Sequence, residues 1–457
     1  MNILPHQQQA LDRIMVNLRL GHGFLHGDPA GTGKTLPALK ACESLTPTDR
    51  VILWVTIAGL KSQIPPEVEK FSINLKPIIL PADLKPRRAI LESLVPYRPS
   101  TLPVILVVNY EQILLHYREF VQLPLSIIVT DECTRLLNHK NKSYKALKYI
   151  AEKTQALRLA LSGTPIVNSP LDAWPLFNYL QPSLLGDYFS FATTYTAPAP
   201  WSKFGFIRQE RLPQLARKLD PFYIRRAREE LSQDLPELLE ETLKIDLSDK
   251  ESKLYRNIRL ALLKEIEDVE ISKVEHKSTL LQSLTQYLRL RQVCDSSELL
   301  GQATNSSKLQ VLKDFIESNK DNKIIIFSEF SEMCKILHRE LPNSVMIIGE
   351  VSLQDRERLL DQFQTDPKTK ILIMSKAGEM GLNIQAADVV VHYDLPPTAK
   401  SLDQRISRAR RQGRKDPVLS VKMICKGTIE VELDKIINKK EDMSLQTMPL
   451  TRLKEIL

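Results

Sequence analysis

Cysteine is scarce in this chain of 457 residues, which contains only five. They are scattered and odd in number, and no two stand at the spacing of metal ligands: Cys42, Cys133, Cys294, Cys334 and Cys425. Disulfide-bonded secreted domains and zinc motifs place their cysteines in even sets at short spacings. The sequence therefore predicts a reduced interior with no disulfide framework and no zinc site.

Long apolar runs are also missing, since none approaches the roughly 20 residues that a bilayer-spanning helix needs. The first residues, MNILPHQQQALDRI, lack the pattern of a secretory signal. We therefore expect a cytoplasmic protein with no membrane partner. Hydrophobic residues make up 43% of the chain and charged residues 26%, ordinary values for globular domains. The net charge of +8 favours a polyanionic partner only weakly.

Short apolar runs alternate with amphipathic stretches in two regions of the chain. Such runs are typical of buried parallel strands, whose carboxyl ends carry the site of an open α/β sheet. The expected strands span residues 51–55, 104–108, 126–129 and 158–161 in the first region, and 323–327, 345–348, 371–374 and 389–393 in the second. The sequence thus predicts two α/β domains.

A helical region separates these two domains. Residues 248–293 contain neither glycine nor proline, and Leu254, Ile258, Leu262 and Ile266 recur on one helix face. An exposed linker, residues 305–307, leads into the second domain. The expected division is a first domain at 1–180, a helical insertion at 181–305, a second domain at 306–440 and a tail at 441–457.

The strongest local signal is the segment at residues 27–35, GDPAGTGKT, which stands between a strand end and a helix start. Gly31 and Gly33 let the backbone approach an anion, Lys34 adds a charge for β- and γ-phosphates, and the Thr35 hydroxyl suits Mg²⁺. The strict phosphate-loop pattern has glycine at the position of Asp28. The segment predicts a nucleotide site and leaves the enzyme class open.

Two acids end the third expected strand. Asp131 can hold Mg²⁺, and Glu132 can orient or deprotonate an attacking water. Adjacent acids also occur as plain surface charges, but a position about 100 residues after a phosphate loop favours catalysis. The turn at residues 162–165, SGTP, reads equally well as an ordinary turn or a functional one.

A guanidinium-rich stretch lies near the end of the second domain, at residues 404–414, QRISRARRQGR. Arg408 and Arg411 share a helix face, and forked guanidinium groups suit a γ-phosphate in its transition state. The alternative is a basic stripe that binds nucleic acid. Both can hold, because Arg405, Arg410, Arg414 and Lys415 remain for the second role.

Taken in order, these motifs resemble those of superfamily 2 helicase-like ATPases, most closely the Swi/Snf (sucrose-non-fermenting) group of DNA translocases. The phosphate loop of that group has aspartate where Asp28 stands. The resemblance spans about residues 4–430 and rests on further strings as well: 4–7 (LPHQ), 60–63 (LKSQ), 109–111 (NYE), 131–136 (DECTRL), 161–168 (LSGTPIVN), 221–226 (PFYIRR), 290–294 (LRQVC), 326–330 (IFSEF), 375–383 (SKAGEMGLN) and 403–413 (DQRISRARRQG).

This resemblance implies an α/β fold of two RecA-like lobes, of the P-loop NTPase type, with helical insertions and with ATP and Mg²⁺ bound between the lobes. The implied nucleotide-binding residues are Gln7, Asp28, Gly31, Thr32, Gly33, Lys34 and Thr35. The implied catalytic residues are Lys34, Asp131, Glu132, Gln404, Arg408 and Arg411, with Thr35 and Asp131 on the metal. The implied DNA contacts are Lys61, Asn109, Tyr110, Ser328, Ser375 and Lys376.

Several residues depart from the group without removing an ATP-hydrolysis residue, and they bear on coupling to DNA: Thr134, Glu379, Met380, Pro396, Pro397, Arg410 and Arg414. The resemblance implies a minimal monomeric motor of phage, viral or bacterial type, acting on duplex or branched DNA with little sequence preference. It would work in the cytoplasm, or in a host's cytoplasm, near the nucleoid. The alternatives are a strand-separating or annealing helicase and a DNA-binding scaffold with an inactive nucleotide site, which the intact catalytic residues disfavour.

Overall fold

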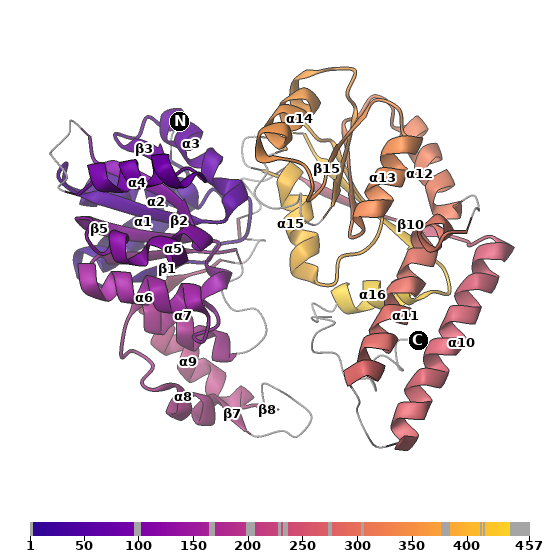
Figure 1. Cartoon of the computed structure of the whole chain (residues 1–457), viewed down its shortest axis with the longest axis horizontal. Helices are drawn as coiled ribbons and strands as arrows, with labels where there is room; N and C mark the ends of the chain where they lie inside the picture. Colours follow the sequence, from indigo (N-terminus) through magenta and orange to yellow (C-terminus); the bar gives the residue numbers. More distant parts are fainter. Residues whose placement is uncertain are drawn as a thin grey trace. The chain divides into compact units, whose positions relative to one another are not determined.

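The chain forms two compact units, Met1–Asp234 (unit 1) and Leu235–Leu457 (unit 2), each with its own parallel sheet (Figure 1). The computed structural model describes residues 3–95, 102–163, 170–197, 206–226, 230–231, 236–272, 277–302, 306–375, 384–411, 414 and 416–438. Two parallel α/β sheets confirm the predicted fold class.

Unit 1 is built on a seven-stranded sheet in the order β3-β4-β2-β5-β6-β1-β9, with every neighbouring pair parallel. Its strands are β1 (Phe24–His26), β2 (Val51–Thr56), β3 (Lys76–Ile79), β4 (Val104–Asn109), β5 (Leu125–Asp131), β6 (Leu157–Leu161) and β9 (Tyr223–Ile224). A separate antiparallel pair joins β7 (Thr196–Ala197) to β8 (Phe206–Ile207).

Helices cover both faces of this sheet, because successive side chains of a buried strand point to opposite faces. Ile52 and Trp54 of β2 pack with α1, α2 and α3, whereas Leu53 and Val55 pack with α5, α6 and α7. The helices of unit 1 are α1 (Pro5–Arg19), α2 (Thr35–Leu45), α3 (Ile64–Lys70), α4 (Leu84–Ser93), α5 (Tyr110–Phe120), α6 (Lys142–Thr154), α7 (Ala173–Leu180), α8 (Tyr188–Tyr195) and α9 (Leu212–Leu219).

Unit 2 has a six-stranded parallel sheet in the order β10-β15-β14-β11-β13-β12. Its strands are β10 (Leu238–Ile245), β11 (Ile324–Ser328), β12 (Ser344–Ile347), β13 (Ile371–Ser375), β14 (Val389–His392) and β15 (Val418–Cys425). Its helices are α10 (Asp249–Ser272), α11 (Lys277–Asp295), α12 (Ser307–Ser318), α13 (Ser331–Glu340), α14 (Leu353–Thr365), α15 (Ala399–Ala409) and α16 (Ile429–Asn438).

The second sheet is also covered on both faces. Ile324 and Ile326 of β11 pack in a core with α11, α12, α13 and α16, whereas Ile325 and Phe327 pack with α14. Each of the eight strands expected from the sequence corresponds to an observed strand whose ends differ by at most two residues. The buried apolar runs were therefore sufficient to locate both sheets.

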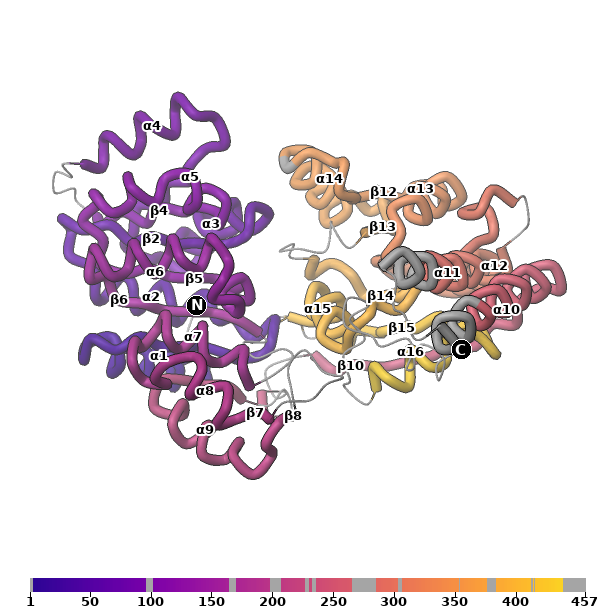
Figure 2. The backbone as a smooth tube through the Cα atoms, turned by 60° about the horizontal axis from the view of Figure 1, so that its bottom comes forward, coloured from indigo at the N-terminus to yellow at the C-terminus, as the bar shows by residue number. Residues whose placement is uncertain are grey.

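The central segment differs from a plain helical insertion. It contributes an edge strand to each sheet, β9 to unit 1 and β10 to unit 2, and the division between units falls inside it. The helical stretch forms two helices, α10 and α11, which lie side by side (Figures 1 and 2). The domain limits at 180, 305 and 440 stay a prediction.

All five cysteines are buried, and none is in a disulfide. In the part of the chain that the structure describes, no helix is long and apolar enough to cross a membrane.

Candidate functional site

The phosphate loop leaves β1 at His26 and enters α2 at Thr35. Gly31 and Gly33 have φ of +87° and +74°, a left-handed conformation that a residue with a Cβ adopts only with strain. Lys34 precedes the first turn of α2 and its side chain does not cap that turn. The loop thus presents a helix start and a left-handed glycine backbone, which let main-chain N–H groups approach a phosphate.

Lys34 folds back over the loop that precedes it. Its Nζ atom donates to the carbonyl oxygens of Asp28 and Pro29, at 2.9 and 3.0 Å. Thr35 is half-buried next to it at the start of α2. The ammonium group therefore sits within the loop, where it can meet the β- and γ-phosphates of a nucleotide.

The acid pair lies on the same edge of the sheet as the phosphate loop. Asp131 ends β5 and is in register with Leu161 of β6, and His26 at the end of β1 is in register with the same Leu161. Because neighbouring strands lie about 4.8 Å apart, the main chains of Asp131 and His26 are roughly 10 Å apart. A nucleotide on the loop can reach this carboxylate through a metal ion.

Asp131 is held in a low-dielectric site. Burial raises the pKa of its carboxyl to about 7, and Glu132 adds to this rise while the charge on Lys34 opposes it. Thr56 Oγ1 donates to Asp131 Oδ2 at 3.3 Å. A carboxylate and the Thr35 hydroxyl are the hard oxygen ligands that suit Mg²⁺, so the residues present fit this ion.

Glu132 has an unusual backbone conformation, with φ +50° and ψ +52°. The left-handed region costs a non-glycine residue of order 1 kcal/mol or more and tends to occur at functional sites. Glu132 precedes the 3₁₀ turn Cys133–Leu136, and the Tyr110 hydroxyl donates to the carbonyl oxygen of Asp131 at 2.9 Å. The strain supports Glu132 as the predicted water-orienting residue, a role that stays a prediction.

Gln7 links α1 to the phosphate loop. Its Nε2 atom donates to the carbonyl oxygens of Thr32 and Gly33, at 3.4 and 3.3 Å, while its Oε1 atom accepts from the main-chain N of Leu4 at 3.1 Å. The side chain is 5% exposed. Its predicted contact with adenine stays a prediction.

Asp28 and Thr32 direct their side chains into the protein. The Asp28 carboxylate is fully buried between His26 and Arg226, and Thr32 Oγ1 donates to the carbonyl oxygen of Pro29 at 2.9 Å. The structure therefore gives these two side chains a role in the shape of the loop. The predicted contact of Asp28 and Thr32 with the nucleotide stays a prediction, and the main chain rather than these side chains would make it.

The turn after β6 packs directly on the phosphate loop. A Cβ atom on Gly163 would lie 3.1 Å from the main-chain N of Ala30, and the main-chain N of Ser162 donates to the carbonyl oxygen of His26 at 3.2 Å. This contact fits either reading of the turn, so its role stays a prediction. Thr164 and Pro165 lie outside the described residues.

A cavity of about 1050 Å³ adjoins the loop through Arg226. Its walls come from α1, α9 and β9, with apolar side chains such as Leu215 and Ile224 and polar ones such as Gln9 and Arg13. The sequence analysis did not predict this cavity, because its walls come from segments about 200 residues apart.

The predicted DNA contacts differ in exposure. The side chains of Tyr110, Ser328 and Ser375 are buried, at 1, 0 and 1% exposed, and this placement contradicts direct contact with DNA. Asn109 Oδ1 caps α5 by accepting from the main-chain N of Gln112 at 2.8 Å. Lys376 lies outside the described residues.

Lys61 remains a candidate for contact with DNA. Burial lowers the pKa of its ammonium group to about 8, and the nearby charge of Arg87 contributes. Its Nζ atom donates to Gln112 Oε1 at 3.0 Å and to the carbonyl oxygen of Leu80. These two bonds leave a third N–H of the ammonium group for a phosphate oxygen.

The arginine-rich stretch contains the expected catalytic side chains and, beside them, arginines that bond within the protein. Gln404 and Arg408 lie on α15 and Arg411 follows it, so the expected catalytic side chains share one short segment of unit 2. Arg405 is fully buried and donates to the carbonyl oxygen of Asp394 at 2.9 Å and to Glu329 Oε1 at 2.6 Å.

Two more arginines are used inside the protein. Arg410 donates to the carbonyl oxygen of Pro236 at 2.7 Å, and Arg414 pairs with Asp388 at 2.7 Å. Together with buried Arg405, they correct the idea that these three side chains remain for nucleic acid. Lys415 lies outside the described residues.

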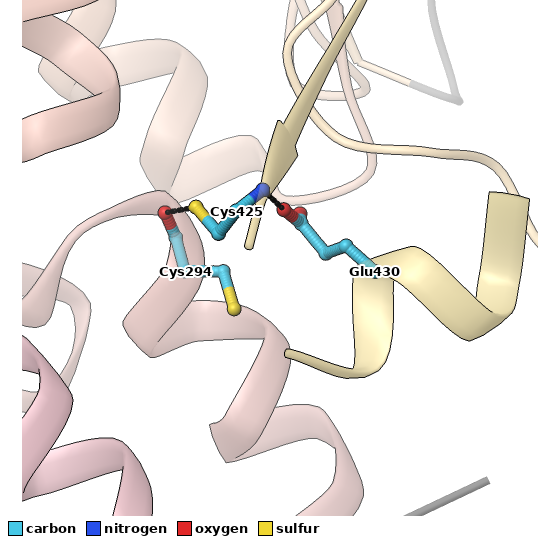
Figure 3. A group of neighbouring side chains, drawn as sticks. All are labelled: Cys294, Cys425 and Glu430. Atoms are coloured by element: carbon cyan, nitrogen blue, oxygen red, sulfur yellow. Dashed lines mark hydrogen bonds between the residues drawn. The ribbon is translucent and has the colours of Figure 1, made fainter. Parts of the chain in front are cut away.

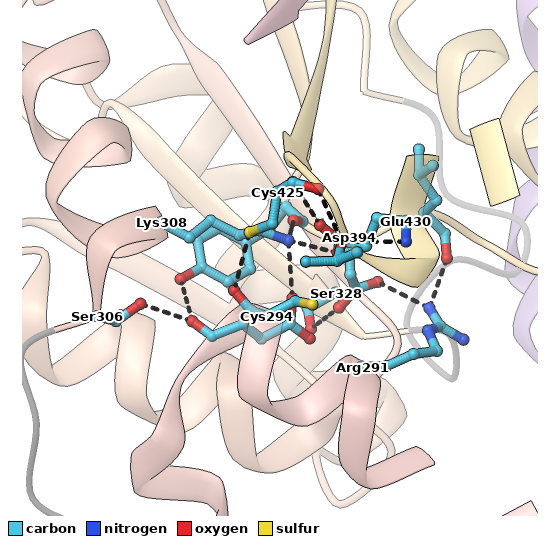
Figure 4. Close-up of polar contacts among 12 residues, drawn as sticks. Arg291, Cys294, Ser306, Lys308, Ser328, Asp394, Cys425 and Glu430 are labelled. Atoms are coloured by element: carbon cyan, nitrogen blue, oxygen red, sulfur yellow. Dashed lines mark hydrogen bonds and ion pairs between the residues drawn. The ribbon is translucent and has the colours of Figure 1, made fainter. Parts of the chain in front are cut away.

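A buried charged cluster in unit 2 was not foreseen from the sequence. Lys308 at the start of α12 is fully buried and lies 2.5 Å from Glu430 and 3.1 Å from Asp295 (Figure 4). Burial raises the pKa of Asp295 well above its ordinary value and outweighs the opposing effect of Lys308. The cluster joins α11, α12 and α16, three segments that the sequence gives no reason to associate.

The fold brings two of the scattered cysteines together in this cluster. One ligand atom each of Cys294, Cys425 and Glu430 lies within 4.8 Å of the others (Figure 3). The two Glu430 oxygens are occupied, one by the Lys308 ammonium and one by the main-chain N of Cys425 at 2.9 Å. The ammonium group already supplies the positive charge that a metal ion would bring.

Comparisons with known proteins agree with this architecture. The SNF2-related domain family matches residues 6–299, and the helicase conserved C-terminal domain family matches residues 307–413. A putative ATP-dependent helicase/translocase of Bacillus subtilis is 30% identical over 70% of this chain and 35% of its own length. An uncharacterised ATP-dependent helicase of Mycoplasma genitalium is 24% identical over 98% of this chain and 42% of its own.

The SWI2/SNF2 ATPase core of Sulfolobus solfataricus in complex with dsDNA aligns with a TM-score of 0.46 at 24% identity, covering 100% of this chain and 95% of that one. The chain spans less than half the length of the two bacterial relatives. The first family match alone covers more than half of the chain, from α1 to just beyond α11. The chain belongs to the SNF2-related family of helicase-like ATPases.

Proposed function

We propose that the chain is a DNA-stimulated ATPase that uses ATP hydrolysis to move along double-stranded or branched DNA. The observation that carries this proposal is the shared sheet edge in unit 1, where Lys34 and the Asp131–Glu132 pair follow strands that both flank β6. Membership of the SNF2-related family supports ATP as the nucleotide and DNA as the polymer. The proposed motor acts as a monomer in the cytoplasm.

Within unit 1, each group has a separate task. The loop backbone from Gly31 to Gly33 and the Lys34 ammonium bind the phosphates, while Thr35 and Asp131 hold Mg²⁺. Mg²⁺ held there would neutralise charge on the phosphate oxygens. Glu132 orients the attacking water and accepts its proton.

Unit 2 supplies Gln404, Arg408 and Arg411 to the same reaction. Guanidinium groups stabilise the charge that develops on the transferred phosphoryl group and are worth about 10³–10⁵ in turnover. Because these residues and the phosphate loop belong to different units, the proposed hydrolysis needs both units of the chain.

Contacts with DNA are proposed to involve phosphates rather than bases. Lys61, Asn109 and Lys376 remain as candidate contacts, and the net charge of +8 favours a polyanion. The structure offers no described feature that favours strand separation over translocation on a duplex.

The test is the steady-state ATPase rate without nucleic acid and with single-stranded DNA, duplex DNA, branched DNA and RNA. The proposal predicts marked stimulation by duplex or branched DNA, and displacement of a triplex strand without unwinding of a forked duplex. Unwinding of the fork would instead identify a strand-separating helicase. ATP turnover that no nucleic acid changes would contradict the proposal.

A further inference from the structure

Arg226 is bonded to the phosphate loop and to α1 at the same time. It follows β9, and its Nε atom donates to Asp28 Oδ1 at 3.2 Å while its Nη2 atom donates to Asp28 Oδ2. Its main-chain N donates to Asp28 Oδ1 at 3.0 Å. Its Nη1 atom reaches the carbonyl oxygen of His6 at 2.8 Å and Gln9 Oε1 at 3.2 Å. Only 12% of the side chain is exposed.

Both carboxylate oxygens of Asp28 accept hydrogen bonds. Its Oδ2 atom lies 2.9 Å from His26 Nε2, and no part of the residue is exposed. Burial alone would raise the pKa of this carboxyl, but the hydrogen bonds from His26 and Arg226 outweigh burial and hold the pKa well below 3.8. The carboxylate therefore stays charged and fixed in one orientation.

The main chain of Asp28 carries this fixed geometry to Lys34. The Asp28 carbonyl oxygen accepts from Lys34 Nζ at 2.9 Å. Arg226, Asp28 and Lys34 thus form one continuous chain of contacts. It runs from β9 to the ammonium group proposed to bind the phosphates.

The backbone of β9 also lies tightly against the start of the loop. Leu25 and His26 pair in register with Tyr223 and Ile224, and the main-chain N of Gly27 donates to the carbonyl oxygen of Ile224 at 2.7 Å. A Cβ atom on Gly27 would lie only 2.5 Å from Tyr223 Cε2. The start of the loop is therefore held against β9 by strand pairing and by close packing at Gly27.

We propose that Arg226 is a positioning residue for ATP, which sets the shape of the phosphate loop and the direction of Lys34 through the Asp28 carboxylate. This inference rests on the proposed ATPase function. Arg226 need not touch the nucleotide. Its contribution is a loop already in the shape that phosphates require, which lowers the cost of binding.

The test compares ATP affinity and turnover in the wild-type chain, Arg226→Gln, Arg226→Lys and Asp28→Asn. Loss of loop shape should raise the KM and the Kd for ATP by about 10- to 100-fold, since small misplacements of binding groups have effects of this size. The kcat at saturating ATP should stay within about threefold, because a loop filled by ATP regains its shape. Arg226→Lys keeps the charge but loses the forked guanidinium group, so its KM for ATP should lie between those of the wild-type chain and Arg226→Gln.

The matched control is Arg225→Gln, which removes the same charge from the neighbouring, exposed residue. It should leave the KM for ATP unchanged. The double variant Asp28→Asn/Arg226→Gln should be no worse than the poorer single variant, since both act through one contact. If Arg226→Gln fails to fold, Arg226→Lys decides the question.

Two outcomes would overturn the positioning role. One is an unchanged KM in a folded Arg226 variant, and the other is an equal effect of Arg225→Gln. Both presuppose a wild-type chain that binds and hydrolyses ATP. If the wild-type chain binds no ATP, the proposed function itself fails, so the two failures are distinguishable.

Discussion

Asp131 and His26 lie level with each other in the sheet of unit 1, because both are in register with Leu161 on the strand between them. One residue ends the strand that carries the acid pair, and the other ends the strand that leads into the phosphate loop. Parallel strands end at the same edge, so residues about 100 positions apart in sequence meet at one site. Predictions about hydrolysis rest on this relationship.

Substitution of two arginines on α15 should affect stability and turnover to different extents. Arg405→Gln leaves Glu329 without its buried partner and should lower the free energy of unfolding by roughly 3–5 kcal/mol. Arg408→Gln should lower the free energy of unfolding by less than Arg405→Gln does, because the Arg408 side chain is only half-buried, and it should reduce kcat by about 10³. Urea unfolding and ATPase assays of both variants check this. Equal losses of stability would contradict the assignment.

The Lys308 cluster should be a major source of stability in unit 2. Lys308→Met leaves Glu430 buried and unpaired, which should cost roughly 3–5 kcal/mol in the free energy of unfolding. The matched control is Lys435→Met, whose exposed pair with Glu432 should contribute less than about 1 kcal/mol. Chemical denaturation measures both. A Lys308→Met chain as stable as the control would show that the cluster contributes little.

The stability of the chain should depend on Asp28 below pH 3.8. The pKa of this carboxyl is held below 3.8 in the folded chain, so as the pH falls the unfolded chain takes up the proton first. The free energy of unfolding therefore falls with falling pH, by at most about 1.4 kcal/mol per pH unit from this one group. Asp28→Asn removes this contribution. The measurement is the free energy of unfolding of the wild-type and Asp28→Asn chains between pH 5 and pH 3. If it falls equally in both chains, Asp28 makes no such contribution.

Binding to DNA should weaken steeply with salt and vary little with sequence. Each phosphate contact releases counterions, so a chain with several contacts should lose at least about tenfold in affinity between 50 and 200 mM salt. Fluorescence anisotropy with two duplexes of unrelated sequence measures both properties. A flat salt dependence, or strong preference for one duplex, would rule out binding through phosphates.

Much of the fold could be predicted from the sequence, because buried parallel strands appear as apolar runs such as residues 51–55. Strand β10 was missed since Glu240 and Glu241 face solvent, which breaks the apolar pattern. The phosphate loop and acid pair were recognisable because their chemistry lies in short contiguous segments.

Depth of burial could not be predicted in the same way. A motif gives the order of residues along the chain but says nothing of what packs over them, so buried Tyr110, Ser328 and Arg405 looked like surface groups. The partner of Asp28 was equally hidden. It is Arg226, which lies about 200 residues away and meets the loop only because β9 pairs with β1.

The most direct test of the proposed function is the comparison of the wild-type chain with Glu132→Gln, in both ATP binding and DNA-stimulated ATP hydrolysis. The substitution keeps the size of the side chain and removes its ability to accept a proton from water. Hydrolysis should fall by at least about 10² while the Kd for ATP stays within a few fold. A Glu132→Gln chain that hydrolyses ATP at the wild-type rate would contradict the assignment of this site.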